Sequence, residues 1–367
     1  MSGPINENLR IVFLDYLRIF AFTSVLVGHK FYDYLIGWIQ DQQAPTLLQI
    51  AAAMLLPLVN GGAVGVVVFF LVSGYVVAHV LQSEAPRAFI FKRIFRIYPL
   101  YLLAVVTQSL LNASVSGDTI DPHVLIPQML LIGDLFATPY ALNGVEWTLR
   151  IEVLFYVGMA GLRSINLLHE RRRWLPWILL GSILVLGLAP PVPSARIWSQ
   201  AYLNIYAPFL LVGVSIYLFE KAKISKLLAF AIVALALLQS YRLLLVYHPH
   251  WVATHPTLLG LLVFVFFWAV RGRLVATAIL LWVSGLTYAV YLFHNWLFDY
   301  FKEALARLAI PVINIDIQAL VALILFCGAL VSIVEKPAIR LGRALQLRIR
   351  DSRKGSGSAD TAKLSES

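Results

Sequence analysis

Residues 58–81 read LVNGGAVGVVVFFLVSGYVVAHVL and contain no Asp, Glu, Lys or Arg. A transmembrane helix needs about 20 consecutive apolar residues, so this stretch is long enough to cross a bilayer. Similar stretches recur along the 367-residue chain, which is 60% hydrophobic and only 13% charged. A soluble domain carries about twice that charge. The sequence therefore predicts an all-α, polytopic bundle of transmembrane helices.

Ten apolar stretches are predicted to span the membrane. A further segment, 124–137, is interrupted by Pro127 and Asp134. It is too short to cross comfortably and is predicted to be a half-helix or an interfacial segment. The ten predicted spans are 10–31, 58–81, 97–113, 146–162, 174–190, 201–219, 226–247, 256–270, 277–299 and 316–334.

The distribution of basic residues predicts the orientation of the bundle. With the N-terminus inside the cell, most of the 29 Lys and Arg residues fall in cytoplasmic segments. This positive-inside bias predicts that both termini are cytoplasmic. Because the basic residues lie between spans rather than on one soluble face, the net charge of +10 does not indicate nucleic-acid binding. Residues 1–350 are predicted to form the transmembrane domain, and the Gly/Ser-rich tail 351–367 is predicted to be disordered.

Aromatic and histidine residues gather at the predicted membrane boundaries. Indole rings prefer the membrane–water interface, so the tryptophans near span ends support the predicted spans. His248, His250 and His255 have no acidic or cysteine partner nearby, which favours a solvated outer loop over a metal site. No metal is predicted. The interfacial tryptophans are Trp38, Trp147, Trp174, Trp198, Trp251 and Trp296.

The first predicted span carries three ionisable residues, Asp15, Arg18 and His29. An ionisable side chain inside a span costs at least about 2.5–3.5 kcal/mol on insertion scales, so each needs a physical reason. Asp15 and Arg18 are three residues apart and can pair on one helix face. Arg18 and His29 are eleven residues apart, which places them on one stripe, about 16 Å apart along the helix axis.

Two other spans bring polar residues to the level of His29. Glu152 lies in the outer half of the fourth span, and His294 and Asn295 lie at the outer end of the ninth. A neutral histidine near a carboxylate can act as a general base near neutral pH. The alternative is that these residues hold the bundle together or line a water-filled cavity.

The predicted loop PRAFIFKRIFRIYP, residues 86–99, combines basic and aromatic residues at the cytoplasmic face. It could be an amphipathic surface helix whose charges only set the topology. Alternatively, Arg93 and Arg96, one helical turn apart, could bind the phosphates of a cytosolic ligand. The glycines of 58–81 and the Ser73-Gly74 pair would allow close approach of a neighbouring helix or of a narrow ligand.

Six motifs in this order together resemble the bacterial acyltransferase-3 family of membrane O-acyltransferases, and the resemblance covers nearly the whole chain apart from the tail. At Val66–Val68 the chain is apolar, whereas many family members carry an acidic or polar residue there. The motifs are LDYLR with His29 eleven residues after Arg18, FFLVSGY at 69–75, KRIFRIYP at 92–99, EWTLRIEVLFY at 146–156, TYAVYLFH at 287–294 and VEKP at 334–337.

The resemblance implies transfer of an acyl group, acetyl by default, from cytosolic acetyl-CoA to a sugar-type hydroxyl. The acceptor would be a glycan or a lipid-linked oligosaccharide, such as an exopolysaccharide precursor, in the bacterial inner membrane. Proteins of polysaccharide assembly are expected as possible partners. The implied catalytic residues are His29, Glu152, which would orient His29, and Arg18. The implied donor-binding residues are Arg93 and Arg96, to which we add Lys92 of the same loop and Ser73 of the glycine-lined span.

Two other functions remain open from the sequence. A transporter or flippase would also carry intramembrane His, Arg and Glu, although the chain shows no internal repeat of the kind found in many carriers. A carrier would not need Arg93 and Arg96 to bind coenzyme A. A catalytically inactive scaffold in a glycan-export complex is the third possibility. The sequence also leaves open whether the acyl group passes directly to the acceptor or first to His29.

Overall fold

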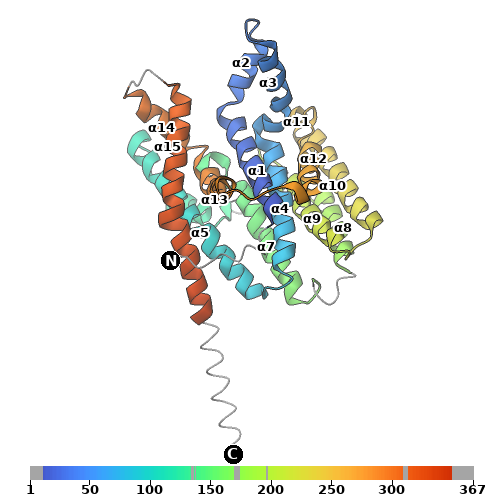
Figure 1. The fold of residues 1–367 in the computed structure, drawn as a ribbon. Coiled ribbons are helices and arrows are strands. Elements are labelled where there is room, and N and C mark those ends of the chain that lie inside the picture. Colours follow the sequence, from blue (N-terminus) through green and yellow to red (C-terminus); the bar gives the residue numbers. More distant parts are fainter. Residues whose placement is uncertain are drawn as a thin grey trace, which may run out of the picture.

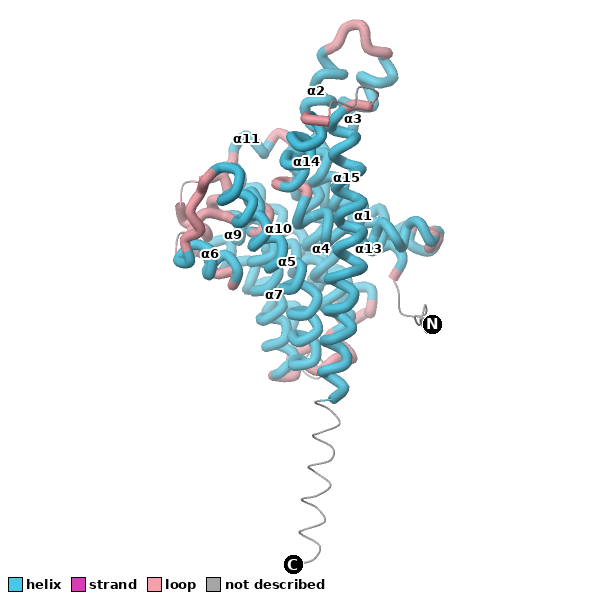
Figure 2. Tube along the Cα trace, turned by 90° about the vertical axis from the view of Figure 1, so that its left-hand side faces the viewer, coloured by secondary structure: helices cyan, strands magenta, loops and turns pink. Residues whose placement is uncertain are grey.

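The computed structural model describes residues 11–348 except 134, 135, 137, 169–173, 196 and 309–312. The described residues form one helical bundle without strands (Figures 1 and 2). The tail 351–367 lies outside the described residues. The helices are α1 (Val12–Lys30), α2 (Tyr32–Gln40), α3 (Thr46–Val59), α4 (Ala63–Val80), α5 (Pro86–Ser116), α6 (Pro122–Met129), α7 (Trp147–Ser164), α8 (Leu175–Leu188), α9 (Tyr202–Glu220), α10 (Lys226–Tyr247), α11 (Pro249–Val252), α12 (Pro256–Ala269), α13 (Ala278–Phe293), α14 (Leu297–Ala306) and α15 (Ile315–Leu330).

Each of the ten predicted spans overlaps at least one helix, and the described chain is a polytopic membrane bundle, as predicted. Within the described chain, seven helices are long and apolar enough to cross a membrane by themselves. Helix α7 carries three charged residues, and α8 has 14 residues. Helices α13 and α14 form an eighth apolar stretch that is bent by 83°. The predicted span 277–299 is therefore not one straight helix but is broken after α13. The cytoplasmic location of the termini stays a prediction.

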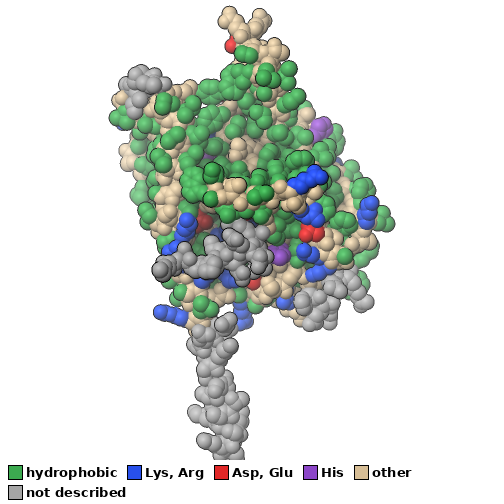
Figure 3. All heavy atoms as spheres, in the orientation of Figure 1, with side chains coloured by type: hydrophobic (Ala, Val, Ile, Leu, Met, Phe, Trp, Pro, Cys, Tyr) green, Lys and Arg blue, Asp and Glu red, His purple; other side chains and the backbone are tan. Residues whose placement is uncertain are grey.

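Two segments between the spans also differ in structure from simple loops. Helix α6 ends at Met129, so segment 124–137 forms no spanning helix in its described part, as predicted. Residues 32–59 form a helical hairpin, α2 and α3, that projects from one end of the molecule (Figure 1). On the face shown in Figure 3, hydrophobic side chains cover the upper part, and Lys and Arg side chains gather toward the lower half.

Helix α4 lies at the centre of the bundle and packs against α1, α9 and α12. Its valine-rich sequence would favour a strand in water. In lipid, however, a single segment can satisfy all its backbone hydrogen bonds only as a helix. Most of its residues are buried. The chain enters α4 through Gly61 and Gly62, whose φ angles of 53° and 70° lie in the left-handed region that glycine adopts at low cost.

Replacing Gly74 by Ala is expected to destabilise the bundle. A Cβ at Gly74 would collide with the backbone carbonyl of Leu210 in α9, so the two helices would have to move apart. Overpacking of this kind costs about 1–3 kcal/mol. The measurement is the apparent Tm of the purified protein in detergent. Gly158→Ala in α7 is the matched control, because a Cβ there meets no atom within 4 Å. Equal melting temperatures for both variants would contradict this account.

Candidate active site

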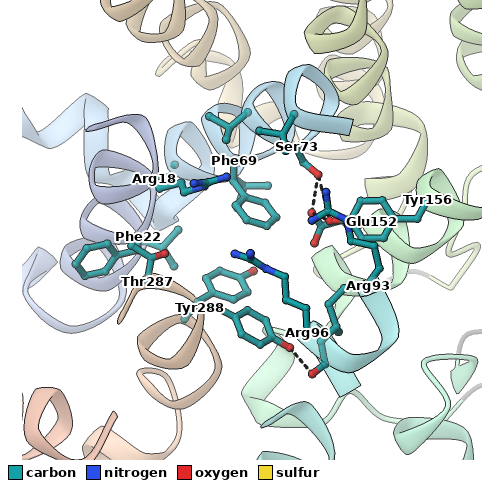
Figure 4. Close-up of a pocket in the computed structure, with 18 residues that line it drawn as sticks. Arg18, Phe22, Phe69, Ser73, Arg93, Arg96, Glu152, Tyr156, Thr287 and Tyr288 are labelled. Carbon is teal, nitrogen blue, oxygen red and sulfur yellow. Dashed lines mark hydrogen bonds between the residues drawn. The ribbon is translucent and has the colours of Figure 1, made fainter. Parts of the chain in front are cut away.

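A cavity lies between α1, α4, α5, α7 and α13. Five of the residues singled out in the sequence line it: Arg18, Ser73, Arg93, Arg96 and Glu152. We call this space the inner cavity. Figure 4 shows Arg18 and Arg96 pointing into it from opposite sides. Residues from four helices, far apart in sequence, therefore converge on one space that carries three cationic side chains.

Glu152 supplies the negative charge of the inner cavity. The Ser73 hydroxyl donates a hydrogen bond to Glu152 Oε1 over 2.6 Å, and the Tyr156 hydroxyl donates to the same oxygen (Figure 4). Glu152 is 5% exposed. The Arg93 guanidinium lies 5.0 Å from the Tyr156 ring centroid and 5.1 Å from that of Phe89, which are cation–π distances. The carboxylate is thus held in place from α4 and from its own helix.

A second cavity contains His29, and we call it the outer cavity. Val25, Val66 and Tyr291 line both cavities, so the inner and outer cavities meet at these three residues. The outer cavity is rich in aromatic rings and has a few amide and imidazole groups. Its other lining residues include Trp147, Trp198, Tyr202, Tyr206, Trp251, Asn143, Asn295 and His250.

His29 is paired with His294. His29 Nδ1 lies 2.9 Å from His294 Nε2, and the two rings are nearly parallel, with centroids 5.1 Å apart. His294 Nδ1 lies 2.7 Å from the carbonyl oxygen of Tyr291 and must donate to it. His294 Nε2 is then an acceptor, so His29 Nδ1 donates to it. This tautomer pattern leaves Nε2 as the basic nitrogen of a neutral His29.

The break between α13 and α14 positions this histidine pair. His294 follows the last residue of α13 and is 1% exposed, whereas His29 is exposed to the outer cavity. The Lys30 ammonium donates to the Asn295 carbonyl oxygen over 2.8 Å and pairs with Asp299 of α14 at 2.8 Å. These contacts fix the end of α1 against the break. Broken helices inside membrane proteins occur where the exposed backbone lines a cavity or is buried in protein.

Two of the predicted site residues make contacts other than those expected. Glu152 was expected to orient His29, but it contacts Ser73 and Tyr156 in the inner cavity. The Glu152 side chain points from α7 toward α4, and the residue that contacts the His29 ring is His294. Lys92 was grouped with the donor-binding residues, but it pairs with Glu84 at 2.6 Å and does not line the inner cavity.

The Asp15–Arg18 pair predicted within the first span is present at 3.4 Å. Asp15 also accepts a hydrogen bond from Ser284 of α13 over 2.6 Å. Arg18 lies in the inner cavity rather than beside His29. This is the separation that eleven helical residues require, and it weakens a direct role for Arg18 at the reacting atoms.

The aromatic wall of the outer cavity was not predicted as part of a site. Trp147, Trp198 and Trp251 were interpreted as interface markers, but they line this cavity. Indole rings at an interface and at a cavity mouth look alike in sequence. His248, predicted to be solvated, is 3% exposed, and its Nε2 lies 2.6 Å from the Gln200 carbonyl oxygen. Among the described residues, no group of three or more His, Cys, Asp or Glu could hold a metal ion.

The fold and this site define a polytopic membrane protein in which an arginine-lined inner cavity meets a histidine-containing outer cavity. Residues 11–334 match the family model described as an acyltransferase domain, and the chain belongs to the acyltransferase-3 family. It is also similar to the acyltransferase MdmB of Streptomyces mycarofaciens, with 28% identity over 196 residues. That match covers 51% of this chain and 47% of the relative, about half the relative's length. No solved structure matches the chain.

Proposed function

We propose that this protein transfers an acyl group, acetyl by default, from cytosolic acyl-CoA to a hydroxyl of a glycan or lipid-linked oligosaccharide in the bacterial inner membrane. One observation carries the proposal: the inner cavity with Arg93 and Arg96 and the outer cavity with His29 share the wall formed by Val25, Val66 and Tyr291. A donor bound in the inner cavity and an acceptor bound in the outer cavity would therefore meet next to His29.

The inner cavity suits the donor. Coenzyme A carries phosphates, which guanidinium groups bind in a bidentate manner. Arg93 and Arg96 would hold these phosphates, and the apolar lining from α4 would take the uncharged pantetheine arm. We assign Arg18, held by Asp15, to the same donor site, since it lines this cavity. Glu152 would keep the arginine side chains oriented and limit the net positive charge of the empty site.

The outer cavity suits a ring-shaped acceptor that carries hydroxyl groups. Ligand sites are typically lined by apolar and aromatic side chains, with a small number of polar groups that fix orientation. Here the rings of Trp147, Trp198 and Trp251 would stack on the apolar faces of a sugar. The amides of Asn143 and Asn295 would bind its hydroxyls.

The chemistry requires one proton to move from the acceptor to the leaving thiolate. His29 Nε2 removes the proton of the acceptor hydroxyl as its oxygen attacks the thioester carbonyl carbon. The carbon–sulfur bond then breaks, the new ester forms, and the proton passes from His29 to the coenzyme A sulfur.

His294 is expected to position His29 through the hydrogen bond between their rings. Replacing His294 by Phe removes the acceptor for His29 Nδ1–H, whereas the amide oxygen of Gln can still accept it. A hydrogen bond to a group that becomes charged is worth about 1.5–3 kcal/mol, so we expect kcat to fall about 10–100-fold in His294→Phe. The KM for acetyl-CoA should not change. Partial recovery of kcat in His294→Gln would show that the hydrogen bond, and not only the packing of the ring, positions His29. Identical kcat values in both variants would contradict this role of His294.

The proposed activity is tested with radiolabelled acetyl-CoA added to host membranes that contain or lack this chain. The expected result is label in the extracted glycan fraction only when the chain is present, and release of that label by mild alkali, as an ester requires. Labelled acetyl-CoA or its products crossing the membrane without covalent incorporation would indicate a carrier instead. Absence of labelled ester with the natural acceptor present would refute the proposal.

A further inference from the structure

The wall between the two cavities consists of Val25 of α1, Val66 of α4 and Tyr291 of α13, because each of them lines both spaces. We propose that this wall limits the length of the acyl group that is transferred, so that the enzyme discriminates acetyl from longer acyl groups. The inference rests on the proposed transfer from acyl-CoA and adds the residues that determine donor specificity.

The acyl group has to reach this wall before transfer can occur. Its carbons form the leading end of the donor, beyond the thioester, while the phosphates stay near Arg93 and Arg96 in the inner cavity. Reacting atoms must approach to about 3–3.5 Å. The thioester carbonyl must therefore come to the boundary with the outer cavity, where His29 and the acceptor lie. The remaining acyl carbons then have to fit among Val25, Val66 and Tyr291.

The two valines are held rigidly by close contact between α1 and α4. A Cβ at Gly62 would lie 2.8 Å from Val25 Cα, and a Cβ at Gly65 would lie 3.0 Å from Ser24 Cβ. The two helix backbones therefore touch next to both valines. Val25 and Val66 are 4% and 8% exposed, and a β-branched side chain has few alternative rotamers in a helix. Neither valine can move aside at low cost.

Tyr291 is fixed as firmly as the valines. Its hydroxyl lies 2.5 Å from the Thr148 hydroxyl and donates to the Val145 carbonyl oxygen over 3.3 Å. Its ring stacks on Phe69, with centroids 6.0 Å apart and an interplanar angle of 8°. The ring is thus held from α4 on one side and from α7 on the other. All three sides of the boundary are set by packing rather than by flexible side chains.

A rigid boundary discriminates by size. One methylene too many or too few in an apolar site changes kcat/KM by roughly 10–200-fold. Replacing Val66 or Val25 by Ala removes two methyl groups from the wall and leaves the helix contacts at Gly62 and Gly65 in place. The space gained would accept one or two further acyl carbons. Val66→Ile, which adds a methylene, would narrow the same boundary.

The experiment measures the ratio of kcat/KM for butyryl-CoA to that for acetyl-CoA, with purified protein in nanodiscs and the host glycan fraction as acceptor. We expect Val66→Ala and Val25→Ala to raise this ratio at least about 10-fold and Val66→Ile to lower it. Val67→Ala is the matched control. Val67 is fully buried on the same helix but faces Gly260 of α12 and lines neither cavity. The control should keep the wild-type ratio.

The outcomes separate this proposal from the proposed function. If all variants transfer acetyl and butyryl in the ratio of the Val67→Ala control, the wall does not select acyl length, although the transfer activity stands. If the wild type neither binds nor transfers any acyl-CoA, both are refuted. Isothermal titration with acetyl-CoA shows which variants are folded. Should Val66→Ala be misfolded, Val25→Ala gives the same readout from the other helix.

Discussion

Replacing His29 by Ala lowers kcat for acyl transfer by about 10²–10⁴-fold, the usual contribution of a general base. His294 lies behind His29, because His294 is 1% exposed and its Nδ1 is committed to the Tyr291 carbonyl oxygen, whereas His29 is the member of the pair that lines the outer cavity. The affinity for acetyl-CoA should stay at the wild-type value, since His29 lies outside the inner cavity, which is the proposed donor site. Transfer of radiolabelled acetyl groups gives kcat, and titration gives the affinity.

The control for this prediction is His255→Ala. His255 is exposed, and its ring stacks against Tyr241 at a centroid distance of 6.2 Å, away from the histidine pair. It should transfer acetyl groups at the wild-type rate. Normal turnover in His29→Ala would remove His29 from the chemistry. Loss of acetyl-CoA binding along with turnover would show instead that the replacement disturbs the whole site.

Replacing Arg93 and Arg96 together by Ala is expected to raise the KM for acetyl-CoA about 100-fold or more. Each guanidinium that binds a phosphate contributes about 1.5–3 kcal/mol, which corresponds to roughly 10–100-fold in affinity. The two effects need not add fully, since both side chains act on one ligand. Lysine at these positions should restore only part of the affinity, because it cannot bind bidentately. The KM is measured over a range of acetyl-CoA concentrations.

Lys92→Ala is the matched control for the arginine pair. Lys92 lies on the same helix and carries the same charge, but it pairs with Glu84 and does not line the inner cavity. A rise in the KM for acetyl-CoA that is limited to the Arg93 and Arg96 replacements would support a specific phosphate-binding site. An equal loss in Lys92→Ala would show that only the overall positive charge of α5 matters, and an unchanged KM in the double variant would exclude Arg93 and Arg96 from the donor site.

The sequence alone predicted the membrane bundle, because apolar runs of spanning length have one stable backbone solution in lipid. It also pointed to His29, Arg18, Glu152, Arg93 and Arg96, since charge inside a span is costly and needs a reason. Helical spacing correctly predicted the Asp15–Arg18 pair and the separation of Arg18 from His29. Periodicity within one helix is sufficient for such statements, because the geometry repeats every 3.6 residues.

Only the tertiary structure decided which residues from different helices meet. The sequence predicted that Glu152 and His29 lie at the same depth in the membrane. In the structure, the orientation of α7 about its axis points Glu152 toward Ser73 instead. The pairing of His29 with His294 depends on the bend after α13, which an uninterrupted apolar run conceals. The aromatic outer cavity and the wall at Val66 likewise come from packing between helices. The sequence determines the spacing of residues along each helix. Side-chain packing between neighbouring helices determines how each helix is rotated about its axis and where it bends.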